Sequence, residues 1–132
     1  MPVVVQHLTQ PSEQDRQDLL KIYADAPQWL LAPFADAAEL VERGLADGLL
    51  FTGRFNDRLL GAAWVERDSD TWRLSRLCVR QLTRNRGVAR RLLEEAQRLA
   101  VLQGAALRLT APDDQHDVAA FAEHLGLTLE TT

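Results

Sequence analysis

The sequence predicts an α+β fold, a mixed sheet that contains an antiparallel meander with helices before and after it. Three observations predict this class. Between Leu49 and Val79, three runs of alternating apolar and polar residues are separated by short turns, which is typical of sequential antiparallel strands. The next segment, from Val88, has the strongest helical periodicity in the chain. The short apolar run Ala106–Ala111 then follows a helix crossover and should lie parallel to the strand before it.

Composition and charge narrow the possible classes of protein. The 132 residues, 46% hydrophobic and 26% charged, are expected to form one domain, 1–132. The net charge of −4 argues against general binding to nucleic acid or to anionic membranes. One cysteine, Cys78, and three scattered histidines are too few for a disulfide framework or a zinc site. Without a signal peptide or a membrane-spanning apolar run, we expect a cytoplasmic protein that binds no metal.

The N-terminal third predicts one strand and two helices. Val3–Leu8 is a β-branched run typical of a strand. Ser12 is expected to cap a helix, whose apolar face is Leu19, Leu20, Ile22 and Tyr23. Asp36 begins a second helix, which is expected to end at Gly44 and Gly48.

Between these two helices lies an apolar segment bounded by prolines, with Trp29, Leu30, Leu31 and Phe34. The segment is either a loop or a short turn of helix. Its aromatic side chains either cover the core or line a site for a ligand or partner. Covering the core is the more common arrangement in small domains.

The meander is predicted from three runs, Leu49–Arg54, Leu59–Glu66 and Thr71–Val79. Phe55-Asn56-Asp57 and Asp68-Ser69-Asp70 are the turns between them. Strict alternation in the third strand gives two predicted faces. One carries Arg73, Ser75, Leu77 and Val79, and the other carries Trp72, Leu74, Arg76 and Cys78.

A long amphipathic helix follows the meander, with the apolar face Val88, Leu92, Leu93, Ala96, Leu99 and Ala100. Gly104 ends it, and the strand Ala106–Ala111 follows. A last short helix ends at Gly126, and Leu127–Glu130 is a terminal strand. The predicted order is therefore β, α, α, β, β, β, α, β, α, β.

The stretch from Leu77 to Leu93 carries the clearest functional signal. An apolar strand ends there, a loop rich in arginine follows, and the amphipathic helix begins just after Gly87. The N-terminus of a helix offers backbone N–H groups and the positive end of the helix dipole, so it favours an anion. The chain has neither a G-x-G-x-x-G motif nor a G-x-x-x-x-G-K-[ST] motif, so the two common nucleotide-binding loops are absent from the sequence.

The loop Arg84-Asn85-Arg86-Gly87-Val88-Ala89, with His124-Leu125-Gly126-Leu127 further on, resembles the GCN5-related N-acetyltransferase (GNAT) fold. The element order matches along nearly the whole chain. In that family a Q/R-x-x-G-x-G/A loop holds the pyrophosphate of acetyl-CoA. The resemblance implies acetyl-CoA as the cofactor, bound by Leu77, Cys78, Val79, Arg84, Asn85, Arg86, Gly87, Val88, Ala89 and Arg90.

Several other pieces are similar to the maturation factors of aspartate 1-decarboxylase, known as PanZ or PanM. They are Ser12 to Arg16, Lys21-Ile22, Arg54 to Leu60, Val79-Arg80 through Thr83 to Arg86-Gly87-Val88, and Leu92 to Glu95. That family, when loaded with acetyl-CoA, docks on the decarboxylase proenzyme and promotes its self-cleavage. The resemblance implies the same partner here, with Arg54 and Asn56 as contacts. The alternative is that Asn56-Asp57 is an ordinary hairpin turn.

Catalytic residues are not identified by the sequence. Most active GNAT enzymes offer an acid to the departing thiolate, usually a Tyr four residues before the Gly of the last helix, and that position here is Ala122. Cys78 or Ser75 could replace it, although a cysteine in a sheet is more often a small core residue. The acids Glu66, Asp68 and Asp70 could act as a base, although acids at a turn are more often surface groups. These features favour ligand sensing over turnover.

Three functions stay open at this point: a regulatory acetyl-CoA sensor, an N-acetyltransferase for an unidentified amine, and a domain that keeps the fold without binding CoA. The sequence departs from the family pattern at Asn85 and Ala89. The GNAT fold usually continues through a second C-terminal strand after Leu127–Glu130. We therefore expect this part to be truncated, and the edge that shapes the acceptor or partner groove to be missing or supplied by another chain.

Overall fold

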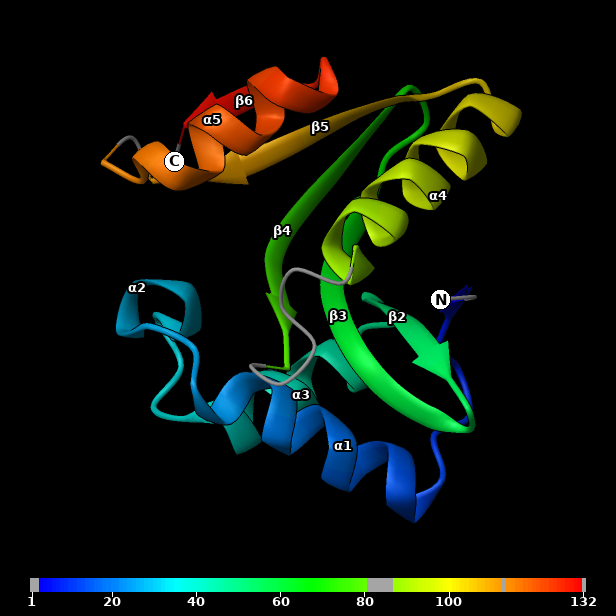
Figure 1. The fold of residues 1–132 in the computed structure, drawn as a ribbon, viewed down its shortest axis with the longest axis vertical. Coiled ribbons are helices and arrows are strands. Elements are labelled where there is room, and N and C mark those ends of the chain that lie inside the picture. The colour runs from blue at the N-terminus through cyan, green and yellow to red at the C-terminus, as the bar shows by residue number, and fades with distance from the viewer. Residues whose placement is uncertain (1–2, 81–86, 113, 132) are drawn as a thin grey trace.

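The computed structural model describes residues 3–80, 87–112 and 114–131. Figure 1 shows a single sheet with helices packed against it. In chain order the elements are β1 (Val4–His7), α1 (Glu13–Ala24), α2 (Gln28–Leu31), α3 (Ala37–Ala46), β2 (Leu50–Phe55), β3 (Arg58–Arg67), β4 (Thr71–Val79), α4 (Val88–Leu102), β5 (Ala106–Ala111), α5 (His116–Leu125) and β6 (Thr128–Thr131). This confirms the predicted α+β order.

The apolar segment after α1 contains the short helix α2, so the helical alternative is the correct one. No helix in the described ranges is long and apolar enough to cross a membrane.

The six strands are hydrogen-bonded in sequence order, from β1 to β6. The pairs from β1 to β4 are antiparallel, which is the predicted meander with β1 added at its edge. β5 is parallel to β4, as the helix crossover predicts, and β6 is parallel to β5. The register with β5 covers only Thr71 to Leu74, whereas β4 continues to Val79. Figure 1 shows β4 and β5 separating beyond their paired ends.

A β-bulge in β4 changes which side chains share a face. Ala62 is opposite Cys78 but Trp64 is opposite Ser75, so β4 carries one extra residue between these pairs. Arg76, at the bulge, has φ of 55°. The predicted grouping of Trp72, Leu74, Arg76 and Cys78 on one face is therefore wrong, because an extra residue reverses the alternation. Trp72 and Leu74 lie in the core that includes Leu93, while Cys78 lies in the core that includes Tyr23.

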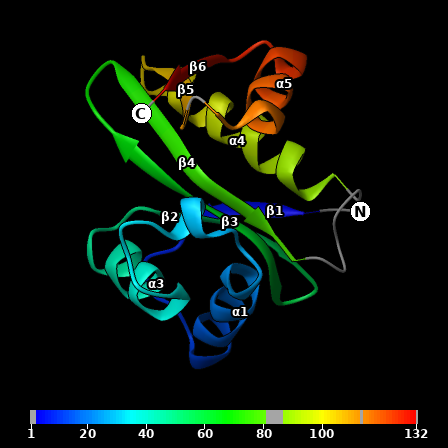
Figure 2. The same cartoon turned by 90° about the vertical axis from the view of Figure 1, so that its left-hand side faces the viewer.

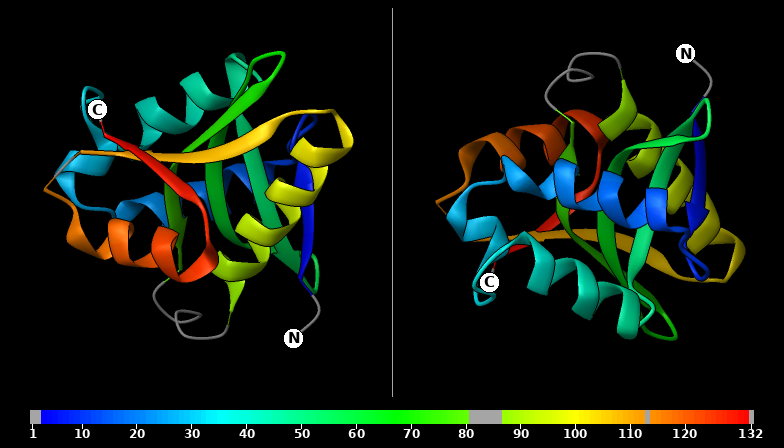
Figure 3. Two further views of the ribbon diagram at one scale, coloured as in Figure 1. Left: turned by 90° about the horizontal axis from the view of Figure 1, so that it is seen from above. Right: turned by 90° about the horizontal axis from the view of Figure 1, so that it is seen from below.

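The helices cover the two faces of the sheet separately. In Figure 2, α1 and α3 lie on one side and α4 and α5 on the other. The two views of Figure 3 show α1 running across the strands on its side and α4 passing close to β1 and the meander on the other. The core under α1 and α3 is centred on Leu19, Ile22 and Tyr23. The core under α4 and α5 is centred on Phe51, Leu74 and Leu93.

Two glycines allow the first turns of α4 to approach the sheet. A Cβ atom on Gly61 would lie 2.9 Å from Cγ1 of Val88 and 3.1 Å from Cδ1 of Leu92. A Cβ atom on Gly53 would lie 3.5 Å from the same Val88 atom. The start of α4 is therefore placed by the absence of side chains on β2 and β3.

We expect Gly61→Ala to lower the free energy of unfolding by about 1–3 kcal/mol, which is typical of overpacking. An alanine in a strand interior gains only about 0.5–1 kcal/mol in backbone entropy relative to glycine, so the clash should dominate. Chemical denaturation would measure the difference. The double variant Gly61→Ala/Val88→Ala removes the clashing methyl group and should be less perturbed than the two single changes added together. A Gly61→Ala protein as stable as the wild type would contradict this account of the packing.

Candidate functional site

The N-terminus of α4 differs from the N-termini of α1 and α3. In α1 the Ser12 hydroxyl accepts a hydrogen bond from the Asp15 N–H at 3.0 Å, which confirms the predicted cap. In α3 the Asp36 carboxylate accepts one from the Glu39 N–H at 2.9 Å. α4 begins at Gly87, which supplies no side-chain cap, and its first turn contains no acidic residue. The positive end of this helix is therefore not balanced by a side chain of its own first turn.

The backbone at Gly87 suits close approach by a ligand. Gly87 is exposed and has φ of 80°, in the left-handed region that favours glycine. A Cβ atom there would meet no atom of the described residues within 4 Å. Its carbonyl accepts the N–H of Arg91 at 2.9 Å, so the N–H groups of Val88, Ala89 and Arg90 precede the first bond of the helix. Unpaired N–H groups at a helix start suit an anion, and binding of one here stays a prediction.

The C-terminal end of β4 lies next to this helix start. Val79 and Val88 are buried in one apolar cluster, and Leu77 and Ala89 pack against it. Cys78 points to the other face, where its thiol donates to the Ile22 carbonyl at 3.2 Å. The structure thus brings the predicted residues Leu77 to Val79 close to Val88 and Ala89.

The remaining predicted cofactor residues have different outcomes. Arg84, Asn85 and Arg86 lie outside the described residues, so their roles stay predictions. Arg90 is exposed, and its guanidinium pairs with Glu94 at 3.3 Å. Its side chain therefore lies along α4, while its backbone N–H belongs to the helix start.

The candidate proton donor Cys78 is committed to the fold, and so is Tyr23, the one tyrosine of the sequence. Tyr23 is fully buried and its hydroxyl donates to the Arg76 carbonyl at 2.8 Å. Burial raises the pKa of Tyr23 well above its ordinary value, so the phenol stays protonated at neutral pH. Cys78 is a buried core residue, in line with the more common interpretation of a cysteine in a sheet. Ala122 is also buried, at 1% exposure, in the core under α5.

The candidate bases are far from the start of α4. Glu66, Asp68 and Asp70 are exposed at or next to the β3–β4 turn, and Asp68 pairs with Arg73 at 2.9 Å. This turn precedes Thr71, whereas the candidate site adjoins Val79, at the other end of a nine-residue strand. At about 3.3 Å per residue, the separation is roughly 25 Å. In the described ranges, no group of three His, Cys, Asp or Glu side chains could hold a metal ion.

No sequence pattern singled out Arg76, which holds the α2 segment against β4. Its guanidinium lies 4.7 Å from the Trp64 ring centre and 5.2 Å from that of Phe34, and it donates to the Leu30 carbonyl. Burial lowers the pKa of this guanidinium from its ordinary value. Leu30 is buried and Phe34 packs against the core, so the segment covers the core, which was the more common of its two expected roles.

We expect Arg76→Lys to increase amide exchange in residues 28–34 by about tenfold, because a lysine replaces neither the planar stacking nor the forked donor geometry of arginine. Hydrogen exchange read by mass spectrometry would measure this. Arg43→Lys is the matched control, since Arg43 is exposed and pairs with Asp47, the residue that follows α3, at 2.8 Å. Equal exchange in wild type and Arg76→Lys would mean that Arg76 does not hold the segment.

The predicted partner residues lie on or beside the β2–β3 turn. Asn56 is exposed with φ of 49°, and Asp57 has φ of 66°, which is the geometry of a tight two-residue hairpin turn. The Arg54 guanidinium pairs with the Asp15 carboxylate at 3.0 and 3.1 Å and also donates to the Asp57 carbonyl at 3.2 Å. Arg54 thus ties the turn to α1, with 23% of its side chain exposed. Its contact with a partner stays a prediction.

Comparison with known proteins gives one family. The family model described as "Acetyltransferase (GNAT) domain, PanZ" matches residues 2–131. The PanD regulatory factor of Escherichia coli strain K12 is 36% identical over 98 residues, covering 74% of this chain and 68% of that protein. The PanD regulatory factor of Salmonella typhimurium strain LT2 is 30% identical over 131 residues, covering 98% and 94%.

The fold is also found in a solved GNAT family acetyltransferase from Elizabethkingia anophelis with acetyl-CoA bound. It has a TM-score of 0.66 and 18% identity, covering 93% of this chain and 74% of that one. At that identity the likeness concerns the fold alone. The family model and the two relatives extend over most of the sequence, and from them it follows that the chain belongs to the PanZ family of GNAT domains.

Proposed function

We propose that this protein binds acetyl-CoA and, in that state, regulates the self-processing of the aspartate 1-decarboxylase proenzyme, PanD. The observation that carries the proposal is the start of α4 at Gly87, which is exposed, without a side-chain cap of its own, and adjacent to the end of β4. It occurs in a chain of the PanZ family. Two relatives of this chain are PanD regulatory factors.

The residues at the α4 N-terminus fit the anionic part of acetyl-CoA. The N–H groups of Val88, Ala89 and Arg90 would donate to the pyrophosphate, and the helix dipole would favour its charge. Arg84 and Arg86 would add cationic groups in front of it. The apolar cluster of Leu77, Val79 and Ala89 would contact the pantetheine arm. The acetyl thioester is the feature that such a protein would sense.

The partner would contact the β2–β3 turn. Asn56 is exposed there, and Arg54 is fixed by Asp15 rather than free to change its conformation. A fixed guanidinium loses little side-chain entropy when a partner binds, which favours a specific contact. The same turn is held by Arg58, whose guanidinium pairs with Asp18 at 2.6 Å.

Several observations support regulation over acetyl transfer. Active transfer needs a proton donor near the sulfur. Tyr23 and Cys78 each donate to a backbone carbonyl, and Ala122 stands at the usual tyrosine position. The exposed acids of the β3–β4 turn lie at the far end of β4.

Calorimetric titration with acetyl-CoA, followed by addition of unprocessed PanD, tests this function. We expect binding of acetyl-CoA and faster cleavage of PanD, measured by mass spectrometry, only when both acetyl-CoA and this protein are present. Arg54→Gln should retain acetyl-CoA binding and lose the effect on PanD. Acetyl-CoA binding with no effect on PanD, but with transfer of the acetyl group to an amine and release of free CoA, would instead identify an N-acetyltransferase.

A further inference from the structure

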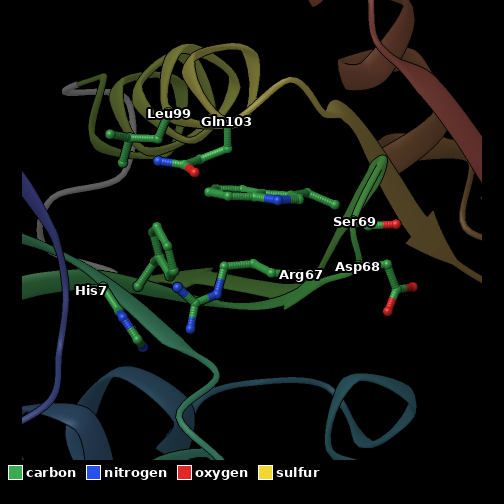
Figure 4. A pocket seen from close by; sticks show the side chains of 8 residues that line it. His7, Arg67, Asp68, Ser69, Leu99 and Gln103 are labelled. Carbon is green, nitrogen blue, oxygen red and sulfur yellow. The ribbon is translucent and has the colours of Figure 1, made fainter.

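A cavity of about 650 Å³ lies at the other end of α4 from Gly87. It is an open hollow bordered by the C-terminal half of α4, the end of β1, β2 and the β3–β4 turn, and its lining is His7, Phe51, Arg67, Asp68, Ser69, Trp72, Leu99 and Gln103. Figure 4 shows Leu99 from α4 and Gln103, which follows α4, on one side of it and Arg67 and His7 on the other. The fifteen residues of α4 span about 22 Å, so this cavity is separate from the candidate acetyl-CoA site. Its volume is within the range of small-molecule sites.

The hollow lies towards the end of α4 that is away from Gly53 and Gly61. The rings of Phe51 and Trp72, 6.2 Å apart and edge to face, belong to the core that also contains Ala96 and Ala100 of α4. Both rings are nearly buried, at 2% and 7% exposure, so they form the floor of the hollow, and Leu99 adds a half-buried aliphatic side chain.

The cavity carries one positive charge that no carboxylate balances within the described residues. The Arg67 guanidinium lies 5.8 Å from the Phe51 ring centre, and its hydrogen bond to the Gly48 carbonyl is long, at 3.5 Å. The neighbouring acid, Asp68, pairs with Arg73 at 2.9 Å, away from Arg67. His7 stacks on Phe51, and its Nε2–H donates to the Gly48 carbonyl at 2.7 Å, so it is already satisfied. An anion entering the cavity would therefore meet Arg67 without displacing a salt bridge.

We propose that this cavity binds a small aromatic monocarboxylate. The forked donors of Arg67 match a carboxylate, and one unbalanced charge suits a monoanion better than a phosphate dianion. The flat body of the ligand would lie against Leu99 and the exposed edge of Trp72, since Phe51 is buried and its ring is already in contact with His7 and Arg67. The amide of Gln103, which Figure 4 shows beside the hollow, would supply a neutral hydrogen bond at its rim.

Benzoate is the probe that tests this site, and benzamide, with the same ring and no charge, is its control. Two-dimensional amide NMR of the full chain should show benzoate shifting Arg67, Ser69 and Gln103, with a dissociation constant in the millimolar range or below. Benzamide should bind at least about tenfold more weakly, because it lacks the charge-assisted hydrogen bonds.

Two variants separate the site from a general effect of charge. Arg67→Gln and Gln103→Glu should each weaken benzoate binding about tenfold or more, while Arg43→Gln, a change of another exposed arginine, should leave it unaltered. Thermal unfolding of each variant shows whether it is folded. Equal binding of benzoate and benzamide, unchanged binding to Arg67→Gln, or no shifts in the lining residues at about 10 mM benzoate would overturn the proposal.

Discussion

Gly87→Val is expected to weaken acetyl-CoA binding by about a hundredfold or more. Gly87 has φ of 80°, which a β-branched residue adopts only under strain, and relief of that strain would rotate the N–H groups at the start of α4. A valine side chain would also occupy the space in front of those groups, where no atom of the described part of the chain lies within 4 Å of a Cβ position. Loss of two or more phosphate hydrogen bonds, at about 1.5 kcal/mol or more each, accounts for the size of the effect.

Gly104→Val is the matched control for this experiment. Gly104 has φ of 75°, and among residues 3–80, 87–112 and 114–131 it also has nothing within 4 Å of a Cβ position, but it follows the C-terminal end of α4. The two valines should therefore have similar effects on the free energy of unfolding, of about 1–2 kcal/mol. Only Gly87→Val should change the affinity for acetyl-CoA, measured by calorimetry. Equal affinities of the two variants would place the ligand elsewhere.

The order and limits of the strands and helices follow closely from local patterns in the sequence. The alternation predicts the limits of two strands, Thr71–Val79 and Ala106–Ala111. The predicted caps are also confirmed, with Ser12 at the start of α1 and Gly126 at the end of α5. These features depend on residues that are near one another in the chain. The turn at Asn56-Asp57 was also predictable, since those residues tolerate positive φ.

The arrangement of β4 could not be predicted in the same way. Strict alternation gives the wrong face for Trp72 and Leu74 relative to Cys78, because the bulge is set by how β4 pairs with β3, through residues more than ten positions away. The bulge turns Arg76 towards Phe34 and Trp64, so these contacts could not be predicted from the residues near Arg76 in the sequence.

The candidate functional residues divide along the same line. The start of α4 was predictable, because a glycine between an arginine-rich loop and an amphipathic helix has a local meaning. The cavity that contains Arg67 was not, since its lining comes from β1, β2, the β3–β4 turn and α4. Glu66, Asp68 and Asp70 were candidate bases in the sequence, but β4 separates them from the start of α4 by the length of the strand.

Asp18→Ala is expected to lower the free energy of unfolding by about 2–4 kcal/mol. Asp18 is fully buried on α1, where it accepts hydrogen bonds from the Arg58 guanidinium and from the Leu59 N–H at 3.1 Å. Removal of the carboxylate leaves the buried N–H of Leu59 without its acceptor and Arg58 without its partner. Glu42→Ala is the control, since its ion pair with Arg16, at 2.6 Å, is exposed and should contribute less than about 1 kcal/mol. Similar losses in the two variants, measured by chemical denaturation, would contradict the role assigned to Asp18.

The same carboxylate should make stability depend on pH. Burial raises the pKa of Asp18, but hydrogen bonds from Arg58, Leu59 and Gln14 lower it by more, so the pKa in the folded state is below the ordinary value of 3.8. Because the folded pKa is lower than the unfolded one, the carboxylate stabilises the fold fully above the unfolded value, and this stabilisation is lost as the pH falls through the folded pKa.

The wild type should therefore lose more stability than Asp18→Ala between about pH 6 and pH 3. Burial also raises the pKa of Asp15, and its hydrogen bonds with Arg54 and Ser12 lower that pKa by more. Asp15 is present in both proteins, so its contribution to the pH dependence cancels in the comparison. Parallel stability curves for wild type and Asp18→Ala would show that Asp18 does not titrate differently on folding.

Because Arg58 and Leu59 hold the end of the β2–β3 turn, Asp18→Ala should also reduce the effect on PanD while leaving acetyl-CoA binding intact. That outcome would separate the turn from the α4 N-terminus as two independent parts of the regulatory function.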